Sequence, residues 1–123
     1  MPEGESYPLY GEHEGYGDPA YITYNLYGDY CTVSVSNLLL INGQADIYFR
    51  LPVEPVEETN TTFMAREGSN YQLVCCTVGH HDYSYTGITE PVLWFRPCEA
   101  DTYNTDYHIS LTITYKYRNN EDF

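Results

Sequence analysis

The stretch that decides the fold is His108-Ile109-Ser110-Leu111-Thr112-Ile113-Thr114-Tyr115-Lys116-Tyr117-Arg118. Its apolar and polar residues alternate with a period of two, which is the pattern of a β-strand with one buried and one solvated face. The segment Cys31-Thr32-Val33-Ser34-Val35-Ser36 repeats this alternation. We therefore expect two strands, with their core-facing side chains at Ile109, Leu111, Ile113, Tyr115 and Tyr117, and at Cys31, Val33 and Val35.

Residues 36–51 contain a turn signal between two apolar runs. Leu38-Leu39-Leu40-Ile41 precedes Asn42-Gly43, and an apolar alternation resumes at Ile47. Asn-Gly suits a type I′ turn, which needs two residues with positive φ and joins paired strands. The sequence therefore predicts a hairpin over 36–51, with Ile47, Phe49 and Leu51 facing the core.

Further strands are expected over residues 20–27, 61–65, 71–78 and 92–96. Pro52 and Pro55 indicate a loop, and turns are expected at residues 67–70 and around Gly79 and Gly87. No window carries the apolar stripe of an amphipathic helix. About seven short strands without a helix are typical of a β-sandwich or a small barrel. We predict an all-β fold, a single-domain antiparallel β-sandwich that is Ig-like or jelly-roll-like.

The chain divides by composition into an extended arm at 1–19, the β-sandwich domain at 20–118 and a polar tail at 119–123. The arm holds four Gly, three Pro and five acidic residues, which cannot form a core. Tyrosines suited to an interface follow one another through the arm and the first expected strand. They are Tyr7, Tyr10, Tyr16, Tyr21, Tyr24 and Tyr27.

This tyrosine segment has three interpretations. The first is a strap that orders against neighbouring subunits, and the second is a secreted recognition segment with sulfated tyrosines. The third is a flexible solubilising tail.

Charge and length limit the function further. The 123 residues carry 18 acidic and 5 basic side chains, a net charge of −13, and suffice for one domain. Such acidity disfavours nucleic-acid partners, which proteins bind through basic side chains. No apolar run is long enough for a membrane span, and Met1-Pro2-Glu3-Gly4 lacks the features of a signal peptide. The first 30 residues hold six acidic and no basic residues, whereas Lys116 and Arg118 make the last strand locally basic.

Four cysteines, Cys31, Cys75, Cys76 and Cys98, allow three disulfide connectivities. In a strand, Cys75 and Cys76 point to opposite faces, so one could reach inward to Cys31 and the other outward to Cys98. The alternative is four reduced thiols that act as small apolar side chains. Asn60-Thr61-Thr62 is a glycosylation sequon in an expected surface loop, and matters only in a secreted chain.

Signals for chemistry are weak. His80-His81-Asp82 is the best metal candidate, but it is expected in a solvated turn and is short of the three or four ligands of a complete site. Cys75 or Cys76 beside His80 would be a nucleophile and base only if the fold brought them together. Glu54, Glu57 and Glu58 lie in the proline-bounded loop and read as solvated carboxylates. Nucleotide-binding and nucleophile-elbow motifs are absent, so we expect no enzyme, no cofactor and no metal.

One stretch resembles a known family. Tyr71-Gln72-Leu73-Val74-Cys75-Cys76, followed by Leu93-Trp94 and Cys98, is similar to the closing strands of arthropod salivary lipocalins. The resemblance covers less than a third of the chain, and the Gly-x-Trp motif that opens lipocalins is absent. The order Cys, Trp, Cys is similar to that of an immunoglobulin domain, but Trp94 lies only four residues before Cys98. We assign no family from the sequence.

The function expected from these features is that of a non-enzymatic structural or interaction protein. Its acidic, tyrosine-rich arm and polar C-terminus would lock the β-domain into an assembly of protein subunits, including copies of itself, with a virion capsid or tail accessory protein as the example. The expected localisation is then a virion or another extracellular assembly. The alternative is a secreted, disulfide-stabilised β-domain that binds a protein or a small ligand.

Overall fold

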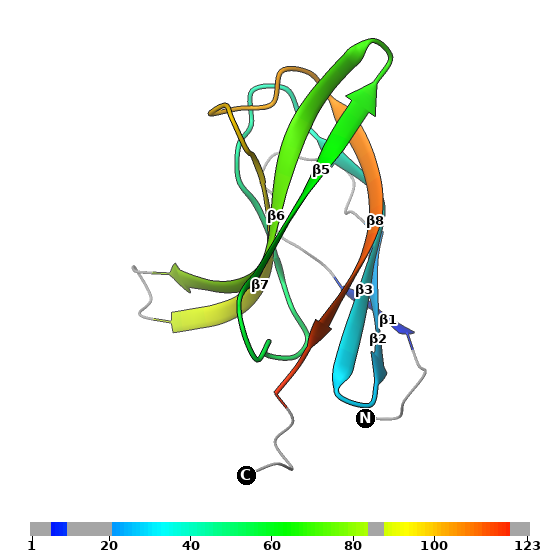
Figure 1. Ribbon diagram of the computed structural model, residues 1–123, viewed down its shortest axis with the longest axis vertical. Coiled ribbons are helices and arrows are strands. Elements are labelled where there is room, and N and C mark those ends of the chain that lie inside the picture. The colour runs from blue at the N-terminus through cyan, green and yellow to red at the C-terminus, as the bar shows by residue number, and fades with distance from the viewer. Residues whose placement is uncertain (1–5, 10–20, 84–87, 119–123) are drawn as a thin grey trace.

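The protein is built from β-strands. The computed structural model describes residues 6–9, 21–83 and 88–118 (Figure 1). Every strand pairing within these residues is antiparallel. The strands are β1 (Ser6–Leu9), β2 (Tyr21–Tyr27), β3 (Tyr30–Leu40), β4 (Ile47–Arg50), β5 (Thr59–Glu67), β6 (Asn70–Tyr83), β7 (Ile88–Pro97) and β8 (Tyr107–Lys116).

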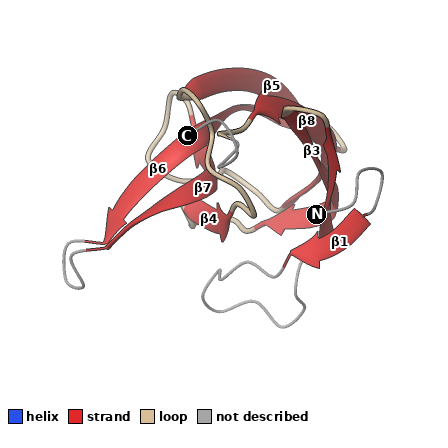
Figure 2. Cartoon of the chain, turned by 90° about the horizontal axis from the view of Figure 1, so that it is seen from below, coloured by secondary structure: helices blue, strands red, loops and turns tan. Residues whose placement is uncertain are grey.

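The strands form two four-stranded sheets. The first sheet has the order β1-β2-β3-β8 and the second the order β4-β7-β6-β5. In the second sheet β5, β6 and β7 follow one another, and β4 lies beside β7, which is a Greek-key arrangement. Figure 2 looks along the molecule and shows the two sheets around a common interior, with β5 beside β8. A hydrogen bond between His108 Nδ1 and Glu67 Oε1, 2.9 Å long, links the sheets on this side. The predicted antiparallel β-sandwich is confirmed.

The core lies between the sheets and follows the predicted alternation. In β8, Ile109 and Tyr115 are buried, whereas the residues between them on the other face are exposed. In β3, Cys31, Val33 and Val35 are buried, as predicted. The largest fully buried side chains include Phe49, Phe95, Tyr103, Tyr107, Ile22 and Leu38. Alternation along each strand therefore supplies the apolar faces that the two sheets bury against each other.

A β-bulge in β3 changes the phase of this alternation. Val35 pairs with Leu111 and Leu38 pairs with Ile109, so Ser36 and Asn37 together lie opposite Ser110. Asn37 has a φ of 54° and its backbone N–H donates to Ser110 Oγ at 2.9 Å. Asparagine is one of the few residues that adopts this conformation readily. The extra residue lets both Val35 and Leu38 point into the core.

The predicted hairpin over residues 36–51 is wrong, although Ile47, Phe49 and Leu51 are buried as expected. β3 pairs with β8, and β4 pairs with β7 in the other sheet. Only Gly43 of the Asn42-Gly43 pair has a positive φ, at 86°, and Gln44 N–H donates to Ile41 O at 3.0 Å. This is the φ pattern of a type II turn, which does not match the twist of paired strands. The chain therefore crosses to the second sheet.

Two other turns contrast with each other. The predicted turn at residues 67–70 is confirmed, and Gly68 supplies its positive φ of 62°. The turn predicted around Gly79 is wrong, because β6 continues through it to Tyr83 and Gly79 pairs with Val92. A Cβ at Gly79 would lie 3.0 Å from Cγ and Oε2 of Glu58. Glycine here makes room for a neighbouring side chain inside a strand. The turn predicted around Gly87 lies outside the described residues.

Part of the predicted arm belongs to the sheet. Residues 6–9 pair with residues 22–25 of β2, which places β1 at the edge of the first sheet. Pro8 fits an edge strand, because proline cannot donate a hydrogen bond to a further strand. The predicted domain of residues 20–118 thus gains a strand from the segment before it. The tail at 119–123 lies outside the described residues.

Candidate interaction surface

The tyrosines predicted for an interaction arm have different surroundings. Tyr24 is buried in the core with 9% of its surface exposed, so the fold does not offer it to a partner. Tyr27 is 73% exposed. Tyr7 and Tyr21 contribute backbone pairs to β1 and β2. Tyr10 and Tyr16 lie outside the described residues.

Tyr27 and Tyr30 form an exposed pair at the tip of the β2–β3 hairpin. Tyr30, which was not among the predicted interaction residues, is 52% exposed and pairs with Lys116 of β8. The turn is fixed from outside: Tyr117 donates its hydroxyl to Gly28 O and its backbone N–H to Asp29 O, both at 2.9 Å. A rigid tip that presents two tyrosines loses little entropy when a partner binds.

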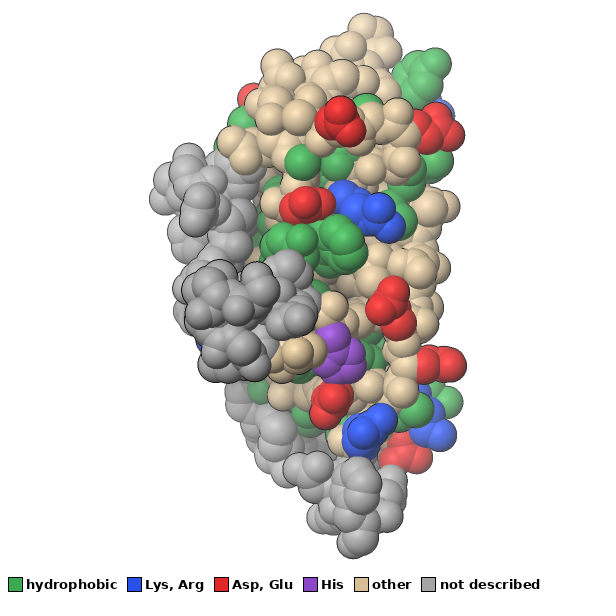
Figure 3. All heavy atoms as spheres, turned by 90° about the vertical axis from the view of Figure 1, so that its left-hand side faces the viewer, with side chains coloured by type: hydrophobic (Ala, Val, Ile, Leu, Met, Phe, Trp, Pro, Cys, Tyr) green, Lys and Arg blue, Asp and Glu red, His purple; other side chains and the backbone are tan. Residues whose placement is uncertain are grey.

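A second aromatic cluster lies on the outer face of the second sheet. The rings of Tyr48 and Trp94 stack with centroids 5.4 Å apart, and the Arg96 guanidinium lies 4.7 Å from the Trp94 ring centre. Trp94 Nε1 donates to Asp46 Oδ1 at 3.0 Å. Figure 3 shows this face, where hydrophobic side chains lie beside basic and acidic ones. Trp, Tyr and Arg are the residue types most enriched at the centres of protein interfaces.

This cluster was not predicted from the sequence. Trp94 and Arg96 have the i, i+2 spacing that puts two strand residues on one face, which was a usable signal. Tyr48 could be added only by knowing that β4 pairs with β7, and the predicted hairpin assigned that segment to another partner.

All four cysteines are free thiols, and the two adjacent ones face opposite ways as predicted. Cys76 points into the core, where burial raises its pKa to about 12. Cys75 lies on the other face of β6, and its thiol hydrogen bonds to that of Cys98. Cys31 is buried in the first sheet next to Tyr115, and burial raises the pKa of its thiol too.

The candidate nucleophile and base are not brought together. His80 lies in β6, not in the expected turn, and its Nε2 is 2.9 Å from Glu54 Oε1. Cys75 lies on the opposite face, and Cys76 is four residues away, about 13 Å along an extended strand. The high pKa of Cys76 also opposes the thiolate that a nucleophile needs. His81 lies in the same strand, and its backbone is in register with Glu90 of β7.

The three candidate glutamates and the sequon residue Asn60 were the other sites considered in the sequence. Glu54 pairs with His80, Glu58 covers Gly79, and Glu57 is exposed. The sequon residue Asn60 lies in β5, not in a loop, and its Oδ1 accepts a hydrogen bond from the buried Thr77 hydroxyl at 2.5 Å.

Within residues 6–9, 21–83 and 88–118, no three His, Cys, Asp or Glu side chains gather as a metal site would require. The described part of the chain also forms no helix of the length and apolarity needed to cross a membrane. No protein-family model matches the chain, and no curated protein matches its sequence.

Proposed function

We propose that this chain is a non-enzymatic interaction protein that packs into a larger assembly by donating its N-terminal strand to a neighbouring copy. A virion shell or tail is the example of such an assembly. The observation that carries the proposal is the antiparallel pairing of Ser6–Leu9 with the edge of β2. An edge strand that accepts a strand from its own chain can accept the same strand from a neighbour, because both use the same backbone hydrogen bonds.

The length and composition of this segment support exchange between copies. β1 has four residues, one of them Pro8, so few hydrogen bonds hold it in place. Residues 10–20 connect it to β2 and contain 11 residues, more than a hairpin loop needs. Fully extended, they reach about 36 Å at roughly 3.3 Å per residue. That reach allows β1 to pair with β2 of an adjacent molecule.

The surroundings of this edge also suit an interface. The Tyr27 and Tyr30 side chains are exposed just beyond the β1–β2 pairing, which ends at Asn25. Lys116 and Arg118 are exposed at the same end of β8, and no carboxylate of the described residues forms an ion pair with them. The acidic N-terminal segment of a neighbour complements these charges.

The proposal is tested by the molar mass of the purified chain under reducing conditions, measured by light scattering and native mass spectrometry over a range of concentrations. We expect an oligomer whose population rises with concentration. Deleting residues 1–9 should return it to a monomer, and Tyr27→Ser with Tyr30→Ser should weaken association. Circular dichroism checks that each variant keeps its β-structure.

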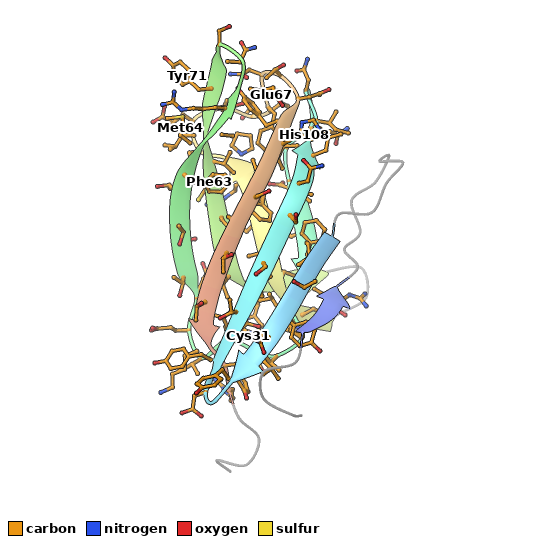
Figure 4. The ribbon with its side chains drawn as sticks, turned by 90° about the vertical axis from the view of Figure 1, so that its right-hand side faces the viewer. Cys31, Phe63, Met64, Glu67, Tyr71 and His108 are labelled. Atoms are coloured by element: carbon orange, nitrogen blue, oxygen red, sulfur yellow. The ribbon has the colours of Figure 1, made fainter. Side chains whose placement is uncertain are left out.

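Tyr71→Ser provides the matched control. Tyr71 is 62% exposed but lies at the β5–β6 turn, at the opposite end of the molecule from the β2–β3 turn (Figures 1 and 4). It should leave the oligomer unchanged. A wild-type chain that stays monomeric throughout, or a truncated chain that associates as well as the full one, contradicts the proposal.

The Tyr48–Trp94–Arg96 cluster favours a second candidate, the secreted β-domain that binds a protein or small ligand. Stacked aromatic rings under a guanidinium, with the Asp46 carboxylate at the edge of Trp94, offer an apolar surface flanked by one positive and one negative charge, which suits an aromatic group. Binding there would change Trp94 fluorescence, and Arg96→Ala would reduce the affinity. Titration with a ligand that copurifies with the secreted chain would test it, and an unchanged affinity of Arg96→Ala would contradict it.

A further inference from the structure

Two of the four cysteines lie side by side on the outer face of the second sheet. Cys75 is in β6 and faces Arg96 of β7, and Cys98 is the first residue after β7. The backbone N–H of Cys98 donates to Leu73 O at 3.1 Å, which continues the β6–β7 ladder by one step. Cys75 and Cys98 are therefore diagonal neighbours on one face, a relation in which side chains of adjacent strands meet.

Their thiols also interact. A side-chain hydrogen bond with Cys75 is among the causes that raise the pKa of the Cys98 thiol. A disulfide also needs its two Cα atoms within about 7 Å. Diagonal neighbours on adjacent antiparallel strands lie about 7–8 Å apart, with their Cβ atoms somewhat closer. The bridge therefore needs only a small shift of Cys98, which lies one residue beyond β7.

The other two cysteines have different neighbours. Cys31 is in the first sheet and its thiol hydrogen bonds to Tyr115. Cys76 points into the core, where it belongs to the apolar cluster between the sheets. Of the three connectivities that four cysteines allow, the structure favours only the one that contains Cys75–Cys98, and it leaves Cys31 and Cys76 as buried thiols.

We propose that Cys75 and Cys98 form a disulfide when the protein meets a small-molecule disulfide such as oxidised glutathione. Cys98 is the more exposed of the two, so the oxidant reaches its sulfur first and its thiolate is the attacking group, although burial and the neighbouring Cys75 raise the pKa of this thiol. It forms a bond to one glutathione sulfur, the glutathione S–S bond breaks, and the first glutathione leaves as a thiolate and takes up a proton.

The Cys75 thiolate then attacks the Cys98 sulfur of this mixed disulfide, and the second glutathione leaves. The two cysteines lose two protons and two electrons, and oxidised glutathione is reduced to two thiols. The product joins β6 to the end of β7 and closes the loop that contains their hairpin, which restricts the unfolded chain and stabilises the fold. This site is independent of the N-terminal strand and of the assembly proposed above.

The test is the intact mass of the folded wild-type chain after equilibration in glutathione buffers of increasing oxidation, followed by thiol alkylation under denaturing conditions. We expect the mass to fall by two hydrogens when the disulfide forms. The alkylating reagent should then modify only the two remaining cysteines. Peptide mapping should find the linked pair to be Cys75 with Cys98. The melting temperature should rise on oxidation by several degrees.

The control variant is Cys98→Ser, which removes a half-exposed thiol outside the core and should show no oxidation-dependent rise in melting temperature. Substituting the buried Cys31 or Cys76 could unfold the protein. Peptide mapping avoids this problem because it is done on the wild-type chain. Four alkylated cysteines at the most oxidising buffer overturn the proposal. A bridge that involves Cys31 or Cys76 overturns it as well.

Discussion

Phe95 gives the sharpest prediction about the core. Its side chain is fully buried in β7 and makes edge-to-face contacts with Phe49, at 6.3 Å between ring centres, and with Phe63, at 6.4 Å. Phe49 lies on β4 and Phe63 on β5, so this one ring touches both edge strands of the second sheet. Replacing it with alanine should therefore weaken the whole sheet.

The magnitude follows from these contacts. Burying a phenylalanine contributes about 1.5–3 kcal/mol, and each edge-to-face pair adds about 0.5–1.5 kcal/mol. We expect Phe95→Ala to lower the free energy of unfolding by about 3–5 kcal/mol, because the cavity that remains cannot fully collapse. Phe95→Leu keeps most of the volume but loses both ring contacts, and should cost about 1–3 kcal/mol.

The assay is urea unfolding followed by circular dichroism, with the slope of the transition checked for constancy. Tyr71→Ala is the control, since Tyr71 is also aromatic but 62% exposed, and it should change stability by no more than about 0.5 kcal/mol. Figure 4 shows Tyr71 near the β5–β6 turn, away from the centre of the sandwich. A cost below about 1.5 kcal/mol for Phe95→Ala, or an equal cost for Tyr71→Ala, would refute the packing described here.

Three other substitutions test local features, each by urea unfolding. Gly79→Ala should not raise the free energy of unfolding while Glu58 is present, because the new Cβ lies 3.0 Å from that side chain. In a Glu58→Ala background the same substitution should stabilise the fold by about 0.5–1 kcal/mol. Equal effects in both backgrounds would contradict the contact. Gly68→Ala should cost about 1–2 kcal/mol because its φ is 62°, and a neutral result would be incompatible with this turn. Burial raises the Cys76 pKa from 9.0 to about 12, so the unfolded state ionises first and stability should fall as the pH rises from 9 towards 12. In Cys76→Ala the fall in stability should be shallower. An unchanged pH dependence would show that the buried Cys76 thiol is not its cause.

Local patterns in β3 and β8 were sufficient to predict which of their residues face the core. The alternation of β8 and β3 depends only on the period of two along one strand, so Ile109, Tyr115, Cys31 and Val33 could be assigned without knowing any partner strand. The same pattern does not say which strands pair. That information is in contacts between residues far apart in the sequence.

The turn at Asn42-Gly43 illustrates the limit. Its dipeptide fits both a type I′ and a type II turn, and contacts with the connection before β8 fix the outcome. Gly43 N–H donates to Tyr103 O at 3.0 Å, and Asn42 N–H donates to Asp106 Oδ1 at 2.8 Å. These partners lie about 60 residues away, beyond the reach of a local pattern.

The candidate sites were predictable to different degrees for the same reason. The opposite orientation of Cys75 and Cys76 followed from strand geometry, and so did the option of an outward Cys98. The position of His80 in a strand could not be predicted in this way, because Gly79 was interpreted as a turn residue. In the structure Glu58, from another segment, occupies the space where a Gly79 side chain would lie. Exposure of Tyr27 and burial of Tyr24 depend on which face of β2 covers the core.

The pairing of β1 with a neighbouring molecule is the central claim, and a photo-crosslink tests it most directly. A photoreactive phenylalanine analogue in place of Tyr7, whose backbone lies opposite Tyr24, is introduced into both ¹⁴N- and ¹⁵N-labelled chains. The two chains are unfolded, mixed, refolded, irradiated under reducing conditions and digested. The account predicts crosslinks between residue 7 of one isotope and the β2 peptide of the other. Crosslinks that join only peptides of the same isotope would contradict it, because they would show that each β1 stays with its own chain.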